Sequence, residues 1–210
     1  MALWALLGAL FTLAVAAASA HATAGGTSTG GASTIGDAAR FGTRELSVGM
    51  EGNDVKVLNG IVKSKSYASG VRLSTVFEGP TEGAVKQFQS EAGLGSTGVV
   101  DKTTSRALRA SMSKAGATWY GPGFYGNSTA CGKTLRRDTI GVAHKSLPCG
   151  TKVTFAYHGR SIVAPVIDRG PYAKGYSFDL TGATAKAIGF TNSDTIRYAV
   201  ARAGSDRRAP

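Results

Sequence analysis

The sequence predicts an α + β multidomain protein, in which a small three-helix domain precedes a small six-stranded β-barrel. Apolar residues recur at helical spacing between residues 44 and 112. Short segments rich in β-branched and aromatic residues then occupy residues 117–202, each bounded by Gly, Pro or Asn. Many short strands in so small a segment are typical of a barrel. The predicted strands are ATWYG, TIGVAHKSL, TKVTFAYHG, RSIVAPVIDRG, YSFDLT and DTIRYAVAR, with one helix, GATAKAIGF, before the last.

Composition sets the class of protein. The chain has 210 residues, of which 42% are hydrophobic and 18% charged, so wholesale disorder and a multi-span membrane protein are both excluded. Lys and Arg total 24 against 13 Asp and Glu, a net charge of +11. Almost all of the excess lies after residue 112, where there is no Glu. This charge either solvates the barrel or binds an anionic partner, and no aromatic pattern interleaves with it as nucleic-acid binding requires.

The two ends of the chain carry no predicted domain. Residues 1–22 are typical of a secretory signal peptide with an A-x-A-type cleavage site, although the absence of Lys and Arg before the apolar run leaves an uncleaved membrane anchor as the alternative. Residues 23–43 are Gly/Ser/Thr-rich and predict a flexible linker, and residues 203–210 form a basic tail. No Cys lies near the signal segment, so we expect a secreted protein rather than a lipoprotein.

Residues 44–112 carry three predicted helices. Val55, Leu58 and Ile61 share one face of the first, and Gly52-Asn53-Asp54 precedes them as a cap. Thr81 is predicted to open the second helix, and Thr103 or Thr104 the third. Similar phrases, LSTVFEGPT and STGVVDKTT, precede these last two helices, which indicates an internal pseudo-symmetric unit.

The runs GMEGNDVKVLN, VFEGPTEGAVKQFQSEAGL and TGVVDKTTSRAL resemble the peptidoglycan-binding three-helix domain of wall hydrolases. The resemblance departs from the family pattern at Ser74, Thr75 and Glu78, where the family has Asp-Gly and Gly. We therefore expect the left-handed backbone positions that Gly serves to be strained or rebuilt here. A helical spacer that binds no ligand is the alternative.

The second resemblance covers the whole C-terminal domain. The runs ATWYGPGFYGNSTACGK, GVAHKSLPCGTKV, GRSIVAPVIDRGPY and SFDLTGATAKAIGF resemble the rare lipoprotein A family, a double-psi β-barrel that includes septal lytic transglycosylases of peptidoglycan. The same barrel occurs in expansin-like wall-loosening proteins and in plant-type defence proteins. The resemblance implies a wall protein of this fold.

A lytic transglycosylase lets the muramyl 6-hydroxyl attack the anomeric carbon, so one acid that later acts as a base is sufficient. Because no Glu follows residue 113, this acid must be an Asp. Asp168 ends an apolar strand at a predicted barrel rim, and its family counterpart is catalytic, as is that of His144. We assign Asp168 as general acid/base and His144 as positioning or protonating. The candidates are Asp138, Asp168, Asp179, Asp194 and Asp206.

Each of these residues also has a structural interpretation. Asp168 is alternatively a turn carboxylate paired with Arg169, and His144 an internally satisfied barrel histidine. Asp179 matches the position of an Asp in the wall-loosening site of expansins and is a third catalytic candidate. Its structural alternative is to cap the helix that begins near Gly182.

The resemblance places Tyr120, Arg169 and Tyr172 in a sugar-binding groove. Strand alternation puts Trp119 and Tyr120 on opposite faces. Lys133 stands where catalytic members of the family carry a functional Glu, and we include it among the substrate-binding residues. Close to Asp168, this cation would favour the ionised carboxylate, which disfavours a general acid and favours polyanion binding.

Two cysteines in a secreted chain predict a disulfide between Cys131 and Cys149. A Cys–His nucleophile pair with His144 and a metal site are weaker alternatives, since no set of residues has metal-ligand spacing. We expect neither a metal nor a cofactor.

Together these features predict a secreted, monomeric lytic transglycosylase that cleaves the MurNAc–GlcNAc bond of peptidoglycan and leaves 1,6-anhydro-MurNAc ends. The alternative is a non-catalytic, expansin-like wall-polymer binder, which Lys133 favours. A protease-inhibitor-like or defence protein is a third hypothesis. The expected partners are glycan strands and anionic wall polymers, with no nucleic acid, and a membrane only if the N-terminal segment stays attached.

Overall fold

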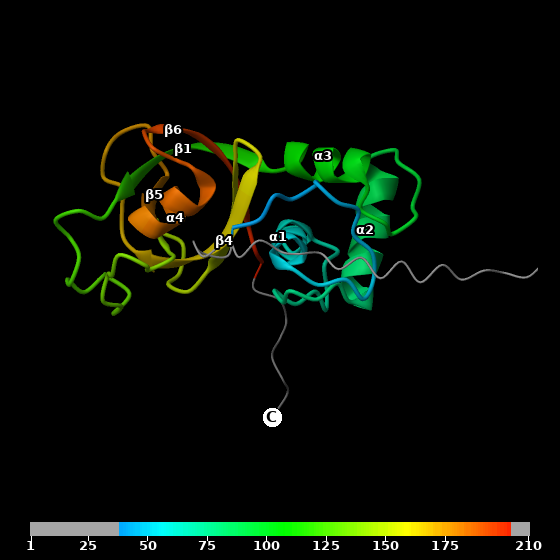
Figure 1. Cartoon of the computed structure of the whole chain (residues 1–210), viewed down its shortest axis with the longest axis horizontal. Coiled ribbons are helices and arrows are strands. Elements are labelled where there is room, and N and C mark those ends of the chain that lie inside the picture. Colours follow the sequence, from blue (N-terminus) through cyan, green and yellow to red (C-terminus); the bar gives the residue numbers. More distant parts are fainter. Residues whose placement is uncertain (1–37, 203–210) are drawn as a thin grey trace, which may run out of the picture. The chain divides into compact units, whose positions relative to one another are not determined.

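A computed structural model describes residues 38–202 (Figure 1). The predicted signal peptide, most of the predicted linker and the basic tail lie outside the described residues. Within residues 38–202, no helix combines the length and the apolar character needed to cross a membrane.

The N-terminal part contains the three predicted helices: α1 (Asn53–Val62), α2 (Gly79–Glu91) and α3 (Lys102–Ala110). The predicted starts of the last two helices were slightly wrong. Helix α2 begins before Thr81 because Pro80 fits the first helical turn. Helix α3 is capped by Asp101, whose carboxylate accepts a hydrogen bond from the Thr104 backbone amide.

The internal repeat has a structural counterpart. The segment before α1 forms an isolated antiparallel bridge with each of the two repeated phrases, Leu46 with Val100 and Glu51 with Val76. Each phrase then leads into a helix, α2 or α3. The same structural unit thus occurs twice: a residue that forms an isolated β-bridge, followed by a helix.

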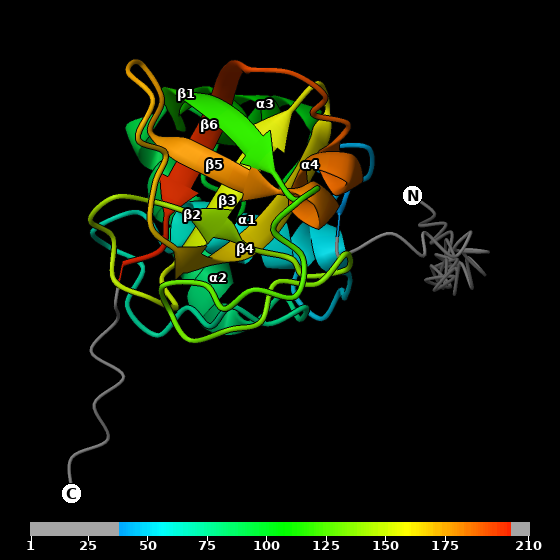
Figure 2. The same ribbon diagram turned by 90° about the vertical axis from the view of Figure 1, so that its left-hand side faces the viewer.

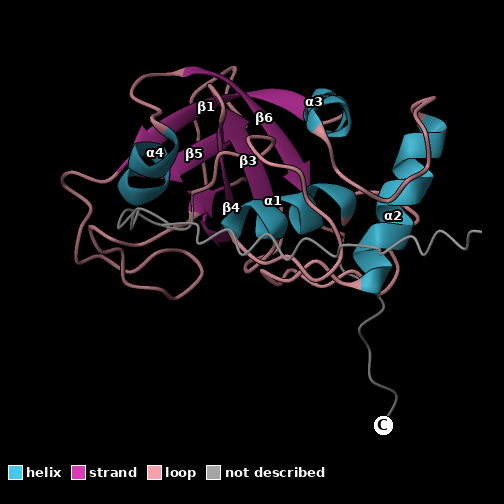
Figure 3. Ribbon diagram, turned by 45° about the vertical axis from the view of Figure 1, so that its right-hand side comes forward, coloured by secondary structure: helices cyan, strands magenta, loops and turns pink. Residues whose placement is uncertain are grey.

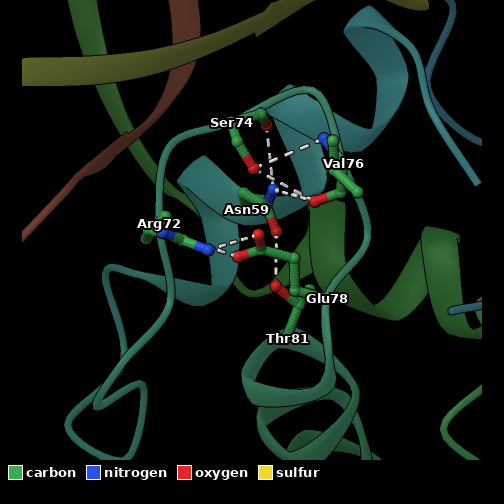
Figure 4. Close-up of polar contacts among 6 residues, drawn as sticks. All are labelled: Asn59, Arg72, Ser74, Val76, Glu78 and Thr81. Carbon is green, nitrogen blue, oxygen red and sulfur yellow. Dashed lines mark hydrogen bonds and ion pairs between the residues drawn. The ribbon is translucent and has the colours of Figure 1, made fainter. Parts of the chain in front are cut away.

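The phrase that departs from the family pattern is rebuilt around the buried Asn59 (Figure 4). The Asn59 amide group donates to the Ser74 and Val76 carbonyls, and its oxygen accepts from the Thr81 hydroxyl. Glu78 is paired with Arg72 at 2.6 Å. Among the described residues, His158 is the only non-glycine with a positive φ, so the substitutions in this phrase are accommodated without left-handed strain.

Residues 113–200 form a closed six-stranded barrel with the neighbour order β1-β5-β2-β4-β3-β6 (Figure 2). Every predicted strand is present, although β2 has only two residues. The strands are β1 (Ser113–Tyr120), β2 (Val142–Ala143), β3 (Lys152–Tyr157), β4 (Arg160–Asp168), β5 (Phe178–Thr181) and β6 (Asp194–Val200). Strand β1 follows α3 almost directly, so the barrel begins before the expected residue 117.

The predicted barrel helix is α4 (Gly182–Ile188), which follows β5 and packs against β4 and β5 (Figure 3). Its N-cap is Thr181, whose hydroxyl accepts from the Thr184 backbone amide. Asp179 therefore does not cap this helix. Inside the barrel, aromatic rings fill the centre, with Phe155 and Phe178 in edge-to-face contact at 5.1 Å between centroids.

The helices pack directly on the barrel. Helix α1 contacts β3, β4 and β6, and Ala156, Val163 and Ala199 of these strands join the apolar core of the helices. The end of the predicted linker takes part: Ala39 exchanges two backbone hydrogen bonds with Ser161, and Phe41 is buried. Residues 38–43 therefore belong to the folded unit, which corrects the predicted extent of the linker, because burial of Phe41 stabilises them.

The contact between α1 and the barrel depends on the absence of a side chain at Gly60. A Cβ there would collide with the Thr154 hydroxyl and approach Val163 Cγ2 to 3.3 Å. We predict that Gly60→Ala lowers the melting temperature, because overpacking costs about 1–3 kcal/mol. One kcal/mol corresponds to roughly 2–4 °C for a chain of this size.

Gly83 in α2 provides the matched control, since no atom lies within 4 Å of its added Cβ. Gly83→Ala should raise the melting temperature slightly, because Ala favours a helix interior by roughly 0.5–1 kcal/mol over Gly. Equal shifts for the two variants in a thermal denaturation experiment would contradict the close approach of α1 to the barrel.

Candidate functional site

One row of paired residues crosses four neighbouring strands of the barrel. Thr118 of β1 pairs with Asp179 of β5, Asp179 pairs with Ala143 of β2, and Ala143 pairs with Asp168 of β4. Paired residues on neighbouring strands face the same side of a sheet. The row therefore places two carboxylates on one face, with the small Ala143 between them.

These residues line a cavity of about 330 Å³. It brings together five of the predicted site residues, Tyr120, Asp168, Arg169, Tyr172 and Asp179. Two aromatic side chains are exposed at its edge: Tyr172 is 83% exposed and Phe124 is 55% exposed. Exposed aromatic faces of this kind suit the apolar faces of sugar rings. The full lining is Thr118, Tyr120, Phe124, Ala143, Asp168, Arg169, Gly170, Pro171, Tyr172, Ala173 and Asp179.

The Asp168 carboxylate is held by three hydrogen-bond donors. Its Oδ1 accepts from the backbone amides of Ala130 at 2.9 Å and Arg169 at 2.8 Å. Its Oδ2 accepts from the Tyr120 hydroxyl at 3.2 Å. These three donors fix the position of the carboxyl group in the cavity. Burial, followed by the charge of Asp168, raises the pKa of Tyr120, so this hydroxyl keeps its proton.

Asp179 has a different environment. Its Oδ1 accepts a single hydrogen bond, from the Thr118 hydroxyl at 2.7 Å. Burial raises the pKa of Asp179; the Thr118 hydrogen bond opposes this, and the negative charge of Asp168 adds to it. A raised pKa keeps a proton on a carboxyl group at higher pH, as a general acid requires. The cavity therefore pairs one carboxylate held by three donors with one that retains its proton more readily.

His144 follows β2 directly and packs its ring against Phe178 at 5.0 Å between centroids. Its Nδ1 accepts from the backbone amides of Ser146 at 3.2 Å and Leu147 at 3.0 Å. An accepting Nδ1 means that the neutral ring carries its proton on Nε2. Burial lowers the pKa of His144, and the charges of Arg169 and Lys145 lower it further. The ring therefore closes a turn as a neutral group.

Arg169 is not an ion-pair partner of Asp168 among the described residues. Its guanidinium donates instead to the carbonyl oxygens of His144 and Leu147 and lies 3.4 Å from Cys149 Sγ. These contacts fasten the 144–149 segment to the end of β4. The guanidinium keeps a positive charge beside the cavity without neutralising Asp168.

The predicted disulfide between Cys131 and Cys149 is present. It ties the 126–135 loop to the segment before β3, and the Cys131 amide also donates to the Ile167 carbonyl. In the chain-entropy description, closing a loop of this length stabilises a fold by about 3 kcal/mol. The disulfide thereby helps to hold the adjacent Ala130 amide in its hydrogen bond to Asp168.

Lys133 lies on the same loop but does not line the cavity. Its side chain is exposed, and its backbone pairs with Thr129. Within residues 38–202 no ion pair joins it to Asp168. The loop docks through the backbone of Ala130 and Cys131, and the Lys133 side chain is not among the groups that line the cavity.

Sequence reasoning missed three parts of this site. Thr118 lies two residues before Tyr120, and strand alternation places both side chains on one face. Its position beside Tyr120 was therefore predictable from the sequence. Phe124 and the Ala130 amide lie in a loop. No local sequence pattern predicts that either of them reaches the cavity. Trp119 is on the opposite face, as expected from alternation, where its indole donates to the Thr191 carbonyl.

The arrangement suits acid-assisted cleavage of a glycoside: two carboxyl groups, one of them with a raised pKa, and two exposed aromatic rings face one cavity. No group of three or more His, Cys, Asp and Glu side chains able to hold a metal ion occurs between residues 38 and 202.

Two family models match the chain. Residues 112–200 match a model described as "Lytic transglycolase", and residues 51–108 match one described as "Putative peptidoglycan binding domain". The two matches coincide with the barrel and with the helical region.

Curated relatives match the barrel region. A Synechocystis protein named "Probable endolytic peptidoglycan transglycosylase RlpA" is 44% identical over 37% of this chain and 25% of its own length. The Campylobacter jejuni protein named "Endolytic peptidoglycan transglycosylase RlpA" is 39% identical over 42% of this chain and 34% of its own. The chain thus spans only about a quarter to a third of these relatives.

Among solved structures, apo expansin from Clavibacter michiganensis is 24% identical over 47% of this chain and 53% of its own, with a TM-score of 0.37. That similarity is too low to add to the argument. The closed barrel, the two family models and the named relatives agree with one another. The chain therefore fits a rare lipoprotein A-like architecture, in which a region that matches a peptidoglycan-binding domain precedes a barrel that matches a lytic-transglycosylase model.

Proposed function

We propose that this chain is a secreted lytic transglycosylase that cleaves the MurNAc–GlcNAc bond of peptidoglycan and leaves 1,6-anhydro-MurNAc ends. The observation that carries the proposal is the pair of carboxylates with unlike environments, Asp168 and Asp179, which line one cavity. The names of the matched relatives and the helical domain before the barrel support the same substrate.

In this mechanism Asp179 donates the proton to the glycosidic oxygen, because burial and the neighbouring negative charge favour its protonated form. This assignment differs from the sequence-based one, which gave that role to Asp168. As the bond to the anomeric carbon breaks, positive charge develops on the sugar. The Asp168 carboxylate, fixed by its three donors, stabilises that charge.

The muramyl 6-hydroxyl then attacks the anomeric carbon. A C–O bond forms within the same sugar, and the hydroxyl proton passes to Asp179, which was left ionised by the first step. Protons therefore balance over the cycle, and no water is consumed. Tyr172 and Phe124 hold sugar rings at the edge of the cavity, and Arg169 supplies positive charge for an anionic group of the substrate.

His144 acts in this proposal as a positioning residue. Its ring accepts two backbone hydrogen bonds and thereby shapes the turn whose carbonyls hold Arg169. Its lowered pKa argues against a protonated imidazolium as the acid.

A wall-polymer binder without catalysis is the second candidate, and one observation favours it: Lys133 replaces the family Glu. Lys133 is exposed on the loop that docks on Asp168, where it is free to contact an anionic polymer. Under this alternative, Lys133→Gln weakens wall binding, whereas changes at Asp179 have no effect on the wall.

The test of the proposed function is incubation of the full chain with purified peptidoglycan, followed by mass spectrometry of the soluble products. We predict anhydromuramyl ends with the unmodified chain and a loss of at least about 100-fold in their rate of formation for Asp179→Asn, the usual scale of general-acid catalysis. Asp138→Asn, an exposed carboxyl outside the cavity, is the control. Reducing muramyl ends, or unchanged release by Asp179→Asn, would contradict the mechanism.

The raised pKa of Asp179 also predicts a pH-dependent effect on stability. The folded state binds this proton more tightly than the unfolded state, so its contribution is present below the unfolded pKa and is lost as pH rises through the folded pKa. Asn stays neutral and still accepts from Thr118. The melting temperature of Asp179→Asn relative to the unmodified chain should therefore increase from pH 4 to pH 7. A difference that is constant over this range would refute the raised pKa.

Two substitutions separate positioning from proton transfer at His144. His144→Asn keeps an acceptor near the place of Nδ1 but cannot carry a catalytic proton, whereas His144→Ala removes the acceptor. We expect His144→Asn to retain most of the cleavage rate. His144→Ala should lose most of that rate and some thermal stability, because the Ser146 and Leu147 amides lose their acceptor. Equal loss in both variants at unchanged melting temperature would instead make His144 a proton carrier.

A further inference from the structure

A second cavity, of about 480 Å³, lies between α3, the β1–β6 pair and the turn joining β3 to β4, and it shares no lining residue with the cavity of Asp168 and Asp179. Four cationic side chains line it: Arg106 and Arg109 of α3, Lys114 of β1 and Arg197 of β6. No Asp or Glu is among its lining residues. Positive charge from three separate elements thus converges on one hollow.

The strand pairing places two of these cations against each other. Lys114 and Arg197 are direct partners in the antiparallel β1–β6 register. Like charges in directly opposite positions destabilise a sheet. Among the described residues neither side chain has an ion-pair partner, so this arrangement costs stability unless an anion neutralises it.

Two of the arginines are held in place by neutral groups. Arg109 Nη1 donates to the Phe41 carbonyl at 3.0 Å. Arg197 Nη1 donates to the Arg109 and Ala110 carbonyls at 3.3 Å each, at the C-terminal end of α3. Carbonyls fix the guanidinium groups without cancelling their charge, and each guanidinium has further N–H donors. Their positions are therefore set before any ligand binds.

The turn at the third side contains His158, which stacks on Tyr157 at 4.0 Å between centroids. His158 has φ 42°, a left-handed conformation that costs energy for a non-glycine residue and is found at ligand sites. Both rings line the cavity. Asp194 accepts from the Tyr157 hydroxyl but is not part of the lining.

We propose that this cavity is a binding site for the phosphate groups of an anionic phosphodiester polymer of the cell wall. Arginine guanidinium groups match phosphate oxygens in bidentate geometry. Cations carried by three separate elements suit the tetrahedral oxygens of a phosphate better than the two coplanar oxygens of a carboxylate. A polymer also supplies successive charges, which suits a group of four cations.

The site is separate from the glycan-cleaving cavity and does not depend on the proposed catalysis. It gives the barrel a second point of attachment to the wall, independent of glycan binding by the helical domain. Part of the excess positive charge of the sequence is therefore concentrated at this cavity.

The test is calorimetric titration of the full chain with a glycerol-phosphate oligomer at low salt. Arg106→Gln/Lys114→Gln removes two exposed cations that hold no ion pair within residues 38–202, so the fold should be retained. We expect this double variant to bind at least about tenfold more weakly, since two charge-assisted contacts with phosphate are lost. Arg136→Gln/Arg137→Gln, with the same change in net charge, should bind like the unmodified chain.

Three results would overturn the proposal. The first is equal weakening in both double variants, which would mean a non-specific charge effect. The second is no measurable binding by the unmodified chain. The third is equal or tighter binding of an oligoglutamate of matched charge, which would refute the phosphate assignment. Cleavage of polymer-free peptidoglycan by Arg106→Gln/Lys114→Gln should be unchanged, so failure of this proposal is distinguishable from failure of the proposed catalysis.

Discussion

The site depends on the pairing of a strand of only two residues. Strand β2 lies between β4 and β5, and its Ala143 is paired with Asp168 on one side and with Asp179 on the other. Neighbouring strands lie about 4.8 Å apart, so the two Asp backbones are separated by roughly 10 Å across this row. A register shift of one residue at β2 would turn one carboxylate to the opposite face. Closure of the barrel fixes that register and leaves no free edge beside β2.

Within this frame, the two carboxylates differ because different parts of the chain reach them. The 126–135 loop brings the Ala130 amide to Asp168, and the disulfide and the Cys131 amide hold that loop in place. Asp179 receives only the Thr118 hydroxyl, and burial raises its pKa. The chemistry we propose follows from this contrast rather than from either residue alone.

Much of this was predictable from the sequence because it depends on local pattern. The three helices, the six strands and the disulfide follow from periodicity, turn residues and the even pair of cysteines. The roles of Asp168 and Asp179 were not predictable, since the amide of Ala130 is 38 residues from Asp168 in the chain. The position of Lys133 was unpredictable for the same reason. Its positive charge suggested an effect on Asp168, but the path of the loop places its side chain outside the lining of the cavity.

The central claim is that the 6-hydroxyl of the substrate, and not water, completes the reaction in the cavity of Asp168 and Asp179. Digestion of peptidoglycan in water enriched in oxygen-18 tests it most directly, with mass spectrometry of the released muramyl ends. The account predicts soluble fragments whose anhydro ends carry no label. Fragments with one heavy oxygen at the muramyl anomeric carbon would show hydrolysis and contradict it, as would the absence of any released fragment.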